Sequence, residues 1–385
     1  MRVTFARSSG ARQTPESLAV PTYVARPIFP DLDDVRKTLD GIWERGILTN
    51  SGPLHQALEV QLAERLAVDH LCLAGSGTTA LLLAMRALAL TGEVITTPFT
   101  FPATTHVLLW LGLTPVFVDI DPRTMTISPE AIELAITPRT SAILGVHVYG
   151  IPCDVAAIAA IAKTHGLRVV YDAAHAFGTR IGETSVLDYG DASALSFHAT
   201  KLFHTGEGGA VVAPDAACDR KLKLLRNFGI ASEVDVPLAG INGKLSELQA
   251  ALGLHVLPLV DEEMTRRREI AAIYRERLGR LPGMQTVSVP EGISDSLQYF
   301  VVRISDRGAR DALYERLKSF NVFARRYFYP LCSTFPSYRE LPSSRADRLP
   351  VAHAVANEVL CLPFFGALGP EGTEQICDII DYLSP

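Results

Sequence analysis

Between residues 55 and 215, apolar and polar positions follow two alternating patterns. Short apolar runs, typical of buried strands, are separated by longer segments in which apolar residues recur at helical spacing. Strands separated by helices of this length predict a mostly parallel sheet with helices on both faces. The predicted strands are Cys72–Ala74, Glu93–Thr96, Pro115–Val118, Thr140–Val148, Leu167–Tyr171, Ala192–Phe197 and Gly209–Val212, and the predicted helices are Leu58–Leu66, Thr78–Leu90, Ala103–Leu111, Pro129–Ile136 and Val155–His165.

After about residue 255 the pattern changes to one typical of a smaller α+β unit. Leu259–Leu278 predicts a long amphipathic helix, which we expect to link two domains. The segments that follow it are a strand at Tyr299–Arg303, a helix at Ala309–Phe320, a loop rich in Pro and Tyr from 327 to 350, and a last helix that begins near Pro370.

These patterns predict an α/β protein with two domains of unequal size. Its 385 residues are more than one hydrophobic core usually serves. We expect a large domain, 21–255, in which a mostly parallel mixed sheet lies between helices. A small α+β C-terminal domain, 256–385, follows it, and residues 1–20 are expected to form an N-terminal tail.

Composition and charge exclude several classes of protein. Hydrophobic residues make up 48% and charged residues 20%, a balance typical of a soluble globular enzyme. The formal charge is -6 and the longest basic cluster is Arg266–Arg268, so no nucleic-acid partner is expected. The six cysteines form no C-x-x-C pair, which argues against a zinc site and favours a reduced, cytoplasmic protein. The first 18 residues lack the apolar core of a signal peptide, and no segment predicts a membrane span.

Two residues suggest a reaction class. Lys201 lies between an apolar segment and a Gly-rich turn, where a surface role is unexpected. Burial disfavours the charged form of an amine, so Lys201 is a candidate for Schiff-base chemistry with a carbonyl compound. Asp172 ends an apolar run 29 residues earlier and is the candidate partner of a protonated ring nitrogen. Its alternative role is a structural pairing with an Arg or with backbone N–H groups.

Three further features fit the binding of a phosphorylated ring. The Gly-rich segment Ala74–Thr79 leads into a predicted helix, whose N–H groups and dipole can hold a phosphate; a plain capped helix start is the alternative. Phe101, in a loop after a predicted strand, can stack on a flat heterocycle or belong to the core. His175 can contact the same ligand as Asp172, or it can be a satisfied polar group.

Taken in order, these segments resemble the DegT/DnrJ/EryC1/StrS family of sugar aminotransferases, which have fold type I and depend on pyridoxal 5'-phosphate (PLP). The resemblance runs from about Ile47 to the end of the chain. It is carried by Leu48–Gly52, Ser76–Thr78, Thr97–Phe101, Asp119–Asp121, Val146–Gly150, Asp172–Gly178, Ser196–Gly209 and Gly240–Glu247.

The resemblance implies a role for each candidate residue. Lys201 would hold PLP covalently and act as the general base, while Asp172 would pair with the ring nitrogen. Phe101 would stack on the ring, and His175 would lie beside its phenolic oxygen. The residues implied to bind the phosphate are Gly77, Thr78 and Ser196 and, from a neighbouring subunit, Asn242.

The same resemblance implies a reaction and its partners. An amino group would pass from L-glutamate to a nucleotide-linked keto-sugar, with pyridoxamine phosphate as the intermediate form of the cofactor. The protein would be a homodimer with shared active sites. Relatives that carry His in place of the lysine are dehydratases, so Lys201 favours transamination. Segments 93–106 and 196–209 most resemble enzymes acting on dTDP-4-keto-6-deoxy sugars.

Other functions stay open at this point. They are a 3-keto-sugar or cyclitol aminotransferase of the same family, another fold-type-I reaction such as cysteine desulfuration or aldol cleavage, and a non-catalytic PLP-binding regulator. Desulfurases have His before the lysine, where this chain has Thr200. Guanidinium groups suit a diphosphate, with surface charges or intersubunit pairs as the alternative. The candidate substrate contacts are Thr49, Arg325, Arg326 and Tyr329.

Overall fold

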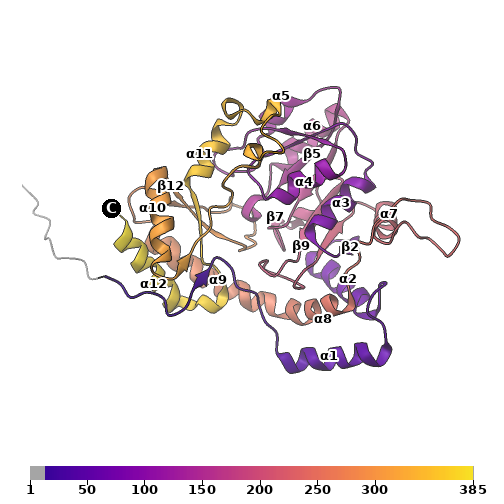
Figure 1. The fold of residues 1–385 in the computed structure, drawn as a ribbon, viewed down its shortest axis with the longest axis horizontal. Helices are drawn as coiled ribbons and strands as arrows, with labels where there is room; N and C mark the ends of the chain where they lie inside the picture. Colours follow the sequence, from indigo (N-terminus) through magenta and orange to yellow (C-terminus); the bar gives the residue numbers. More distant parts are fainter. Residues whose placement is uncertain (1–13, 385) are drawn as a thin grey trace, which may run out of the picture.

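The computed structural model describes residues 14–384 and contains a seven-stranded sheet (Figure 1). In spatial order its strands are β2 (Leu71–Ala74), β10 (Gly209–Val212), β9 (Ala192–Ser196), β6 (Arg168–Asp172), β5 (Thr140–Val146), β3 (Glu93–Thr96) and β4 (Thr114–Phe117). β10 is antiparallel to both of its neighbours, and the other neighbouring pairs are parallel. The mostly parallel mixed sheet that the sequence predicts is therefore confirmed.

Helices cover both faces of this sheet, because successive side chains of a strand point to opposite faces. Along β2, Cys72 and Ala74 pack with one group of helices, while Leu71 and Leu73 pack with another. The first group consists of α3 (Gly77–Ala87), α4 (Pro102–Trp110) and α7 (Ala216–Arg226), and the second of α2 (Pro53–Leu66) and α8 (Glu247–Val256). On the same face as the second group, α5 (Pro129–Ala135) and α6 (Val155–His165) pack against Ile95 and Ile143 of the neighbouring strands.

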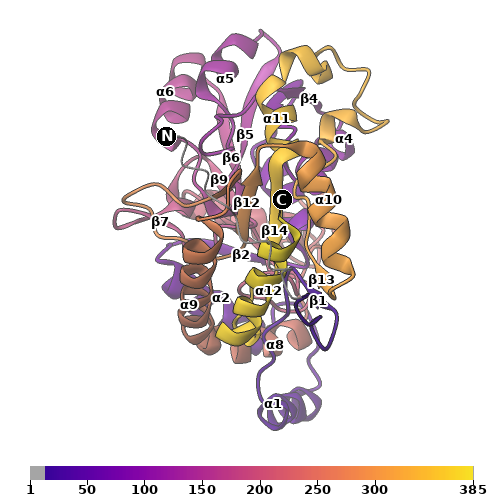
Figure 2. The ribbon, with the colours of Figure 1, turned by 90° about the vertical axis from the view of Figure 1, so that its left-hand side faces the viewer.

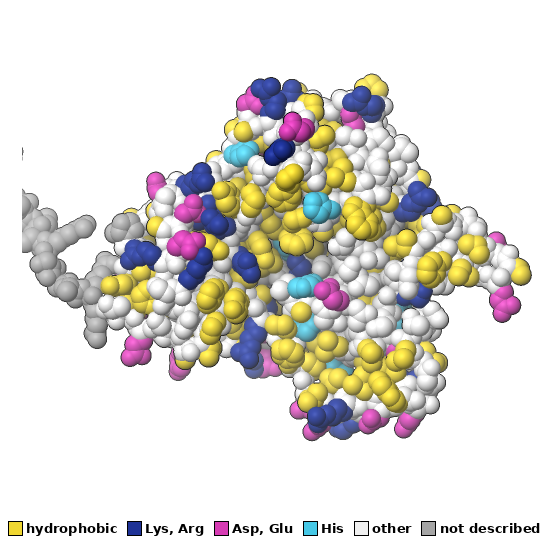
Figure 3. Space-filling view, in the orientation of Figure 1, with side chains coloured by type: hydrophobic (Ala, Val, Ile, Leu, Met, Phe, Trp, Pro, Cys, Tyr) yellow, Lys and Arg dark blue, Asp and Glu magenta, His cyan; other side chains and the backbone are white. Residues whose placement is uncertain are grey.

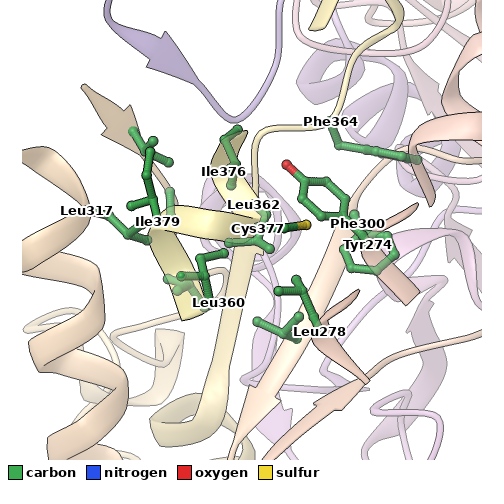
Figure 4. Close-up of a cluster of buried hydrophobic side chains, with 14 of the residues drawn as sticks. Tyr274, Leu278, Phe300, Leu317, Leu360, Leu362, Phe364, Ile376, Cys377 and Ile379 are labelled. Atoms are coloured by element: carbon green, nitrogen blue, oxygen red, sulfur yellow. The ribbon is translucent and has the colours of Figure 1, made fainter. Parts of the chain in front are cut away.

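A smaller antiparallel sheet lies in the C-terminal part of the chain (Figure 2). Its strands are β11 (Met284–Thr286), β12 (Phe300–Ile304) and β14 (Val359–Leu362). Tyr274, Phe300, Leu360 and Ile376 meet in its core, which Figure 4 shows in close-up. The helices of this part are α9 (Val260–Leu278), α10 (Arg307–Lys318), α11 (Pro350–Glu358) and α12 (Gly369–Leu383).

The first described residues pack against this C-terminal part. Leu18 is buried in the same core, and its N–H donates to the carbonyl of Phe320 over 3.1 Å. β1 (Thr22–Tyr23) pairs in parallel with β13 (Val322–Phe323). Residues 1–13 of the predicted tail lie outside the described residues, and the division of the chain into domains at residue 255 stays a prediction.

Two segments project from the body with apolar side chains exposed. One is α1 (Leu32–Arg45), whose Trp43 is 70% exposed, and the other is the loop after α7, where Val234 is 96% exposed. Figure 1 shows both segments extending away from the sheets, and Figure 3 shows hydrophobic side chains gathered over them. Clustered apolar surface of this kind is typical of protein–protein contact.

The predicted strands and helices are present with shifted ends. β5 ends at Val146, two residues earlier than predicted, because a single 3-10 turn follows in which Tyr149 has a φ of 57°. β6 extends to Asp172, so this carboxylate belongs to the strand itself. α1, α7, α8, α11 and β14 lie outside the predicted elements. α8 begins with a capping box between Ser246 and Gln249, a signal that the sequence pattern contains.

Candidate active site

A cavity of about 360 Å³ opens at the carboxyl edge of the parallel strands. The ends of β6 and β9 contribute Asp172 and Ser196, and the loop after β9 contributes Lys201. Ligands of open α/β sheets bind at this edge. The predicted cofactor-binding residues that line the cavity are Gly77, Thr78, Phe101, Asp172, His175, Ser196 and Lys201.

Asp172 is a buried carboxylate, 5% exposed, with both oxygens hydrogen-bonded. The Thr104 hydroxyl donates to Oδ2 over 2.7 Å, and the Ala174 N–H donates to Oδ1 over 3.1 Å. Burial raises the pKa of Asp172, while these two donors and the charge of Lys201 act to lower it. A protonated ring nitrogen bound beside Asp172 would act in the same direction as Lys201 and favour the ionised carboxylate.

Lys201 lies in the turn between β9 and β10 and is half-buried in the cavity wall. Its N–H donates to the carbonyl of His198 over 2.8 Å. Burial lowers the pKa of Lys201 to about 8, although the charge of Asp172 acts to raise it. A neutral amine is therefore accessible near physiological pH, as covalent attachment to a carbonyl group and proton transfer both require.

The His175 ring is held in one tautomer and one orientation. The Tyr149 N–H donates to Nδ1 over 3.2 Å, so Nδ1 is the acceptor and Nε2 carries the proton of the neutral ring. Burial lowers the pKa of His175 well below its usual value, which keeps the ring neutral. Phe328 stacks on the ring at 5.9 Å, and Tyr299 meets it edge-on at 5.0 Å. His175 is therefore fixed as a neutral hydrogen-bond donor through Nε2.

The start of α3 has the geometry of a phosphate site. Ser76 caps the helix by accepting from the Thr79 N–H over 3.1 Å, and the first N–H groups of a helix have no intrahelical acceptor. A Cβ on Gly77 would lie 2.7 Å from the Cβ of Ser196, so only glycine lets these two segments approach. The Ser196 side chain is thereby placed beside the helix start, where a phosphate is favoured by the N–H groups and the helix dipole.

Aromatic side chains make up part of the cavity wall. Phe101 precedes α4 and is 54% exposed while it lines the cavity. Tyr299, Tyr327 and Phe328 line it from segments that belong to the C-terminal part of the chain. The cavity therefore offers an amine, a carboxylate, a helix N-terminus and a flat aromatic surface, a set that fits the aldehyde, ring nitrogen, phosphate and ring of PLP.

The remaining predicted residues lie outside this cavity in the described chain. Asn242 is exposed and follows Ile241 on a segment that forms an isolated bridge with Asn227. Thr49 is exposed on the segment after α1, and Arg325 is exposed as well. None of these three residues lines the cavity of its own subunit.

Arg326 and Tyr329 belong to a separate cluster of charged and aromatic side chains. Arg326 donates to Asp311 over 3.0 Å, and its guanidinium lies 5.0 Å from the centre of the Tyr329 ring. The Tyr329 hydroxyl accepts from Arg307 over 3.2 Å, and both residues line another cavity of about 320 Å³. Neither predicted contact reaches the cavity that contains Lys201.

Several residues of the cavity lie outside the sequence predictions. Thr104, which donates to Asp172 without lining the cavity, is also outside them, and no local sequence signal marks it. Tyr299 and Tyr327 carry no such signal, since they are remote in sequence from the Lys201 segment. Their place depends on how the C-terminal part packs against the large sheet.

Residues 14–384 offer neither a metal site nor a membrane-spanning helix. In this range no group of three or more His, Cys, Asp and Glu side chains has a geometry that could hold a metal ion. Over the same residues, no helix combines the length and apolar character that crossing a membrane requires.

Comparisons with known proteins agree with this geometry. Residues 31–381 match the model of the DegT/DnrJ/EryC1/StrS aminotransferase family. The dTDP-4-amino-4,6-dideoxy-D-glucose transaminase of Escherichia coli is 44% identical, over 93% of this chain and 97% of the relative. The UDP-N-acetyl-3-dehydro-alpha-D-glucosamine 3-aminotransferase of Acidithiobacillus ferrooxidans is 36% identical, over 95% and 98%.

Solved structures share the fold as well. The crystal structure of DesI in the presence of its TDP-sugar product superposes with a TM-score of 0.90 at 38% identity, covering 95% of this chain and 93% of that one. This likeness extends over both sheets, because the covered share includes nearly all of the chain.

Proposed function

The chain belongs to the DegT/DnrJ/EryC1/StrS family of PLP-dependent sugar aminotransferases, and from this premise we propose its substrates and the roles of its residues. The protein is a transaminase that acts on a nucleotide-linked sugar. We propose that its acceptor is a dTDP-linked 4-keto-6-deoxyhexose. The supporting observation is the 44% identity, over nearly the full length of both chains, to a dTDP-4-amino-4,6-dideoxy-D-glucose transaminase.

When bound, PLP supplies an aldehyde that joins an amine and a ring that accepts electrons from the substrate carbon. Asp172, held by Thr104 and Ala174, is proposed to keep a proton on the ring nitrogen. His175 is proposed to donate from Nε2 to the phenolic oxygen, because its Nδ1 already accepts from Tyr149. These contacts orient the ring and set its charge.

Two further contacts are proposed for the ends of the cofactor. Gly77, Thr78 and Ser196 hold the phosphate, since the start of α3 presents N–H groups beside the Ser196 side chain. Phe101 covers one face of the ring at the mouth of the cavity. The phosphate of the cofactor would thus be held at one end of the cavity and its ring nitrogen at the other. The reacting carbon would then lie within reach of Lys201.

Lys201 is proposed to carry the catalytic proton. Its amine, with the pKa lowered to about 8 by burial, would take a proton at Nζ from the substrate carbon and pass it to the cofactor carbon on the other side of the intervening nitrogen. Positioned proton transfer of this kind contributes about 10²–10⁴-fold to a rate. Removing the amine should cost more than that, because the covalent attachment is lost as well.

We further propose that L-glutamate is the donor and that the active sites are shared in a homodimer. Asn242 and Thr49 are exposed in the single chain and do not line its own cavity, which suits a role in the cavity of a partner. The exposed apolar side chains of α1 and of the loop after α7 supply surface for such an interface. All six cysteines are unpaired, which suits a reducing compartment, and we propose the cytoplasm.

The acceptor is tested by mixing the pyridoxamine form of the protein with dTDP-4-keto-6-deoxyglucose and, separately, with a UDP-linked 3-keto-sugar. We expect the dTDP sugar to restore the PLP absorbance and to yield a 4-amino sugar by mass spectrometry. Preference for the 3-keto-sugar would favour the alternative that the Acidithiobacillus ferrooxidans relative represents. Failure of glutamate to generate the pyridoxamine form would exclude glutamate as donor.

A further inference from the structure

One side chain from the C-terminal part of the protein forms hydrogen bonds with the backbone on both sides of Lys201. The Gln298 amide accepts through Oε1 from the Leu202 N–H over 3.0 Å. It also donates through Nε2 to the Thr200 carbonyl over 3.0 Å. The two peptide groups that flank Lys201 are thus bonded to a single planar amide from a residue nearly a hundred positions away.

Gln298 is itself held in place. It is 3% exposed, and it follows Leu297 and lies two residues before the start of β12 at Phe300. The Leu297 carbonyl accepts from Arg267 over 3.0 Å, and Arg267 is paired with Glu263 over 2.6 Å within α9. The position of Gln298, and with it the two hydrogen bonds that flank Lys201, is therefore fixed by a buried ion pair in a long helix and not by a flexible surface loop.

The chemistry of the contact is selective for an amide. Leu202 is buried, so its N–H needs an acceptor, and the half-buried Thr200 contributes a carbonyl that accepts from the same amide. Glutamate supplies only acceptors when ionised, and leucine supplies neither. A glutamine satisfies both groups at once and leaves little freedom for the turn between them.

We infer that Gln298 is a positioning residue for Lys201. By fixing the backbone at Thr200 and Leu202, it sets the place of the Lys201 Cα, and so the point from which the amine reaches into the cavity. The inference rests on the proposed role of Lys201 as the reacting amine. It also gives the C-terminal part a direct contact with the catalytic segment, beside the Tyr299 that lines the cavity.

The test compares two ligands of the full-length protein after PLP has been removed. Pyridoxamine phosphate binds without a covalent link, so its affinity reports the rest of the cavity. PLP capture, fixed by borohydride and located at Lys201 by peptide mass, reports the position of the amine. In Gln298→Leu we expect capture to slow by about a hundredfold, as for a reacting group displaced by about 1 Å, with pyridoxamine phosphate affinity unchanged.

Gln298→Glu serves as the second variant, because it keeps an acceptor for the Leu202 N–H while losing the donor. In this variant PLP capture should slow by less than in Gln298→Leu, and the affinity for pyridoxamine phosphate should again be unchanged. The matched control is Gln375→Leu, which removes an exposed amide that donates to the carbonyls of Glu16 and Ser17. Capture at the wild-type rate in both Gln298 variants would overturn the inference. So would an equal loss of affinity for both ligands, since that marks a purely structural role.

The outcome also separates this inference from the proposed function. If the wild-type protein captures no PLP at Lys201, the proposed function fails. If the wild type captures PLP and the Gln298 variants do so equally well, only the positioning role fails.

Discussion

The Thr104 hydroxyl donates a hydrogen bond of 2.7 Å to Oδ2 of Asp172 across 68 positions of sequence. Thr104 is also 2.7 Å from the Thr100 hydroxyl, and both threonines are buried in the first part of α4 and the loop before it. The pair holds the carboxylate at the end of β6 in one orientation. It also opposes the effect of burial, which raises the pKa of Asp172.

Thr104→Val is predicted to weaken cofactor binding, because it replaces the donor by a methyl group of similar size. The pKa of Asp172 should rise further, so less of the carboxylate is ionised at neutral pH. Loss of a hydrogen bond to a charged group costs about 1.5–3 kcal/mol. The measurement is the dissociation constant of pyridoxamine phosphate, by absorbance titration. Thr104→Ser keeps a hydroxyl and is the control; equal affinity in the Val and Ser variants would contradict the role.

In the protein without PLP, the ionisation of Lys201 should make the free energy of unfolding depend on pH. Its pKa of about 8 in the folded state is below the usual 10.5, so the unfolded chain binds more protons between these values. Stability from this group therefore rises as pH increases through that window and is lowest below it. Lys201→Met should be more stable than wild type at pH 7 in urea unfolding, with the difference shrinking towards pH 10.5. Lys163→Met, at an exposed position of α6, should show no such trend; a constant difference for Lys201→Met would count against the shifted pKa.

Gly77→Ala is predicted to damage the phosphate site. The added Cβ would lie 2.7 Å from the Cβ of Ser196, so α3 or β9 must move. Such overpacking typically costs about 1–3 kcal/mol, and the affinity for pyridoxamine phosphate should fall as well. Both are measurable, by urea unfolding and by titration. Gly41→Ala is the matched control, because its Cβ meets only the end of the flexible Arg45 side chain. Wild-type affinity in Gly77→Ala would mean that this close approach is not needed.

Glu59 should be essential for the stability of the large sheet. Burial acts to raise its pKa, but His55, Arg226 and Lys223 together lower the pKa of Glu59 to about 2. Its contribution is thus present above the usual value of 4.5 and is lost as the pH falls towards 2. Glu59→Gln leaves Arg226, 5% exposed, without its charged partner and should cost about 3–5 kcal/mol in urea unfolding at pH 7.

The control for Glu59 is an exposed ion pair. Asp261→Asn removes the partner of Arg65 at the surface and should cost about 0–1 kcal/mol. Similar losses in the two variants would show that burial of the Arg226 pair is unimportant.

Co-expression of Lys201→Ala with Asn242→Ala tests the shared site. If Asn242 acts in the cavity of the partner, a mixed dimer has one site with both changes and one site with neither. Transaminase activity with high cofactor affinity should then reappear, although each variant alone lacks it. A mixture that behaves as the sum of the two single variants would place Asn242 in its own subunit, or would show that no such dimer forms.

The strands of the large sheet could be predicted because most of their side chains are buried and form short apolar runs. α7 was missed, because charged residues interrupt its apolar positions and only Leu222 and Leu225 among its apolar side chains are buried. α1 escaped prediction for a similar reason, with Ile42 as its buried residue. Charged residues make up half of α1 and nearly half of α7, which obscures the amphipathic pattern that both helices carry.

The sequence by itself determined the fold class and the identity of the reactive groups. These groups belong to local features, each formed by residues that are consecutive in the sequence. The features are an apolar strand that ends in Asp172, a Gly-rich helix start at Gly77 and a lysine before a Gly-rich turn. Only the tertiary structure decided how these groups are held. The hydroxyl on Asp172, the N–H that fixes the tautomer of His175 and the Gln298 amide beside Lys201 all come from distant segments. Their contacts depend on the packing of strands and helices against each other, which no local pattern specifies.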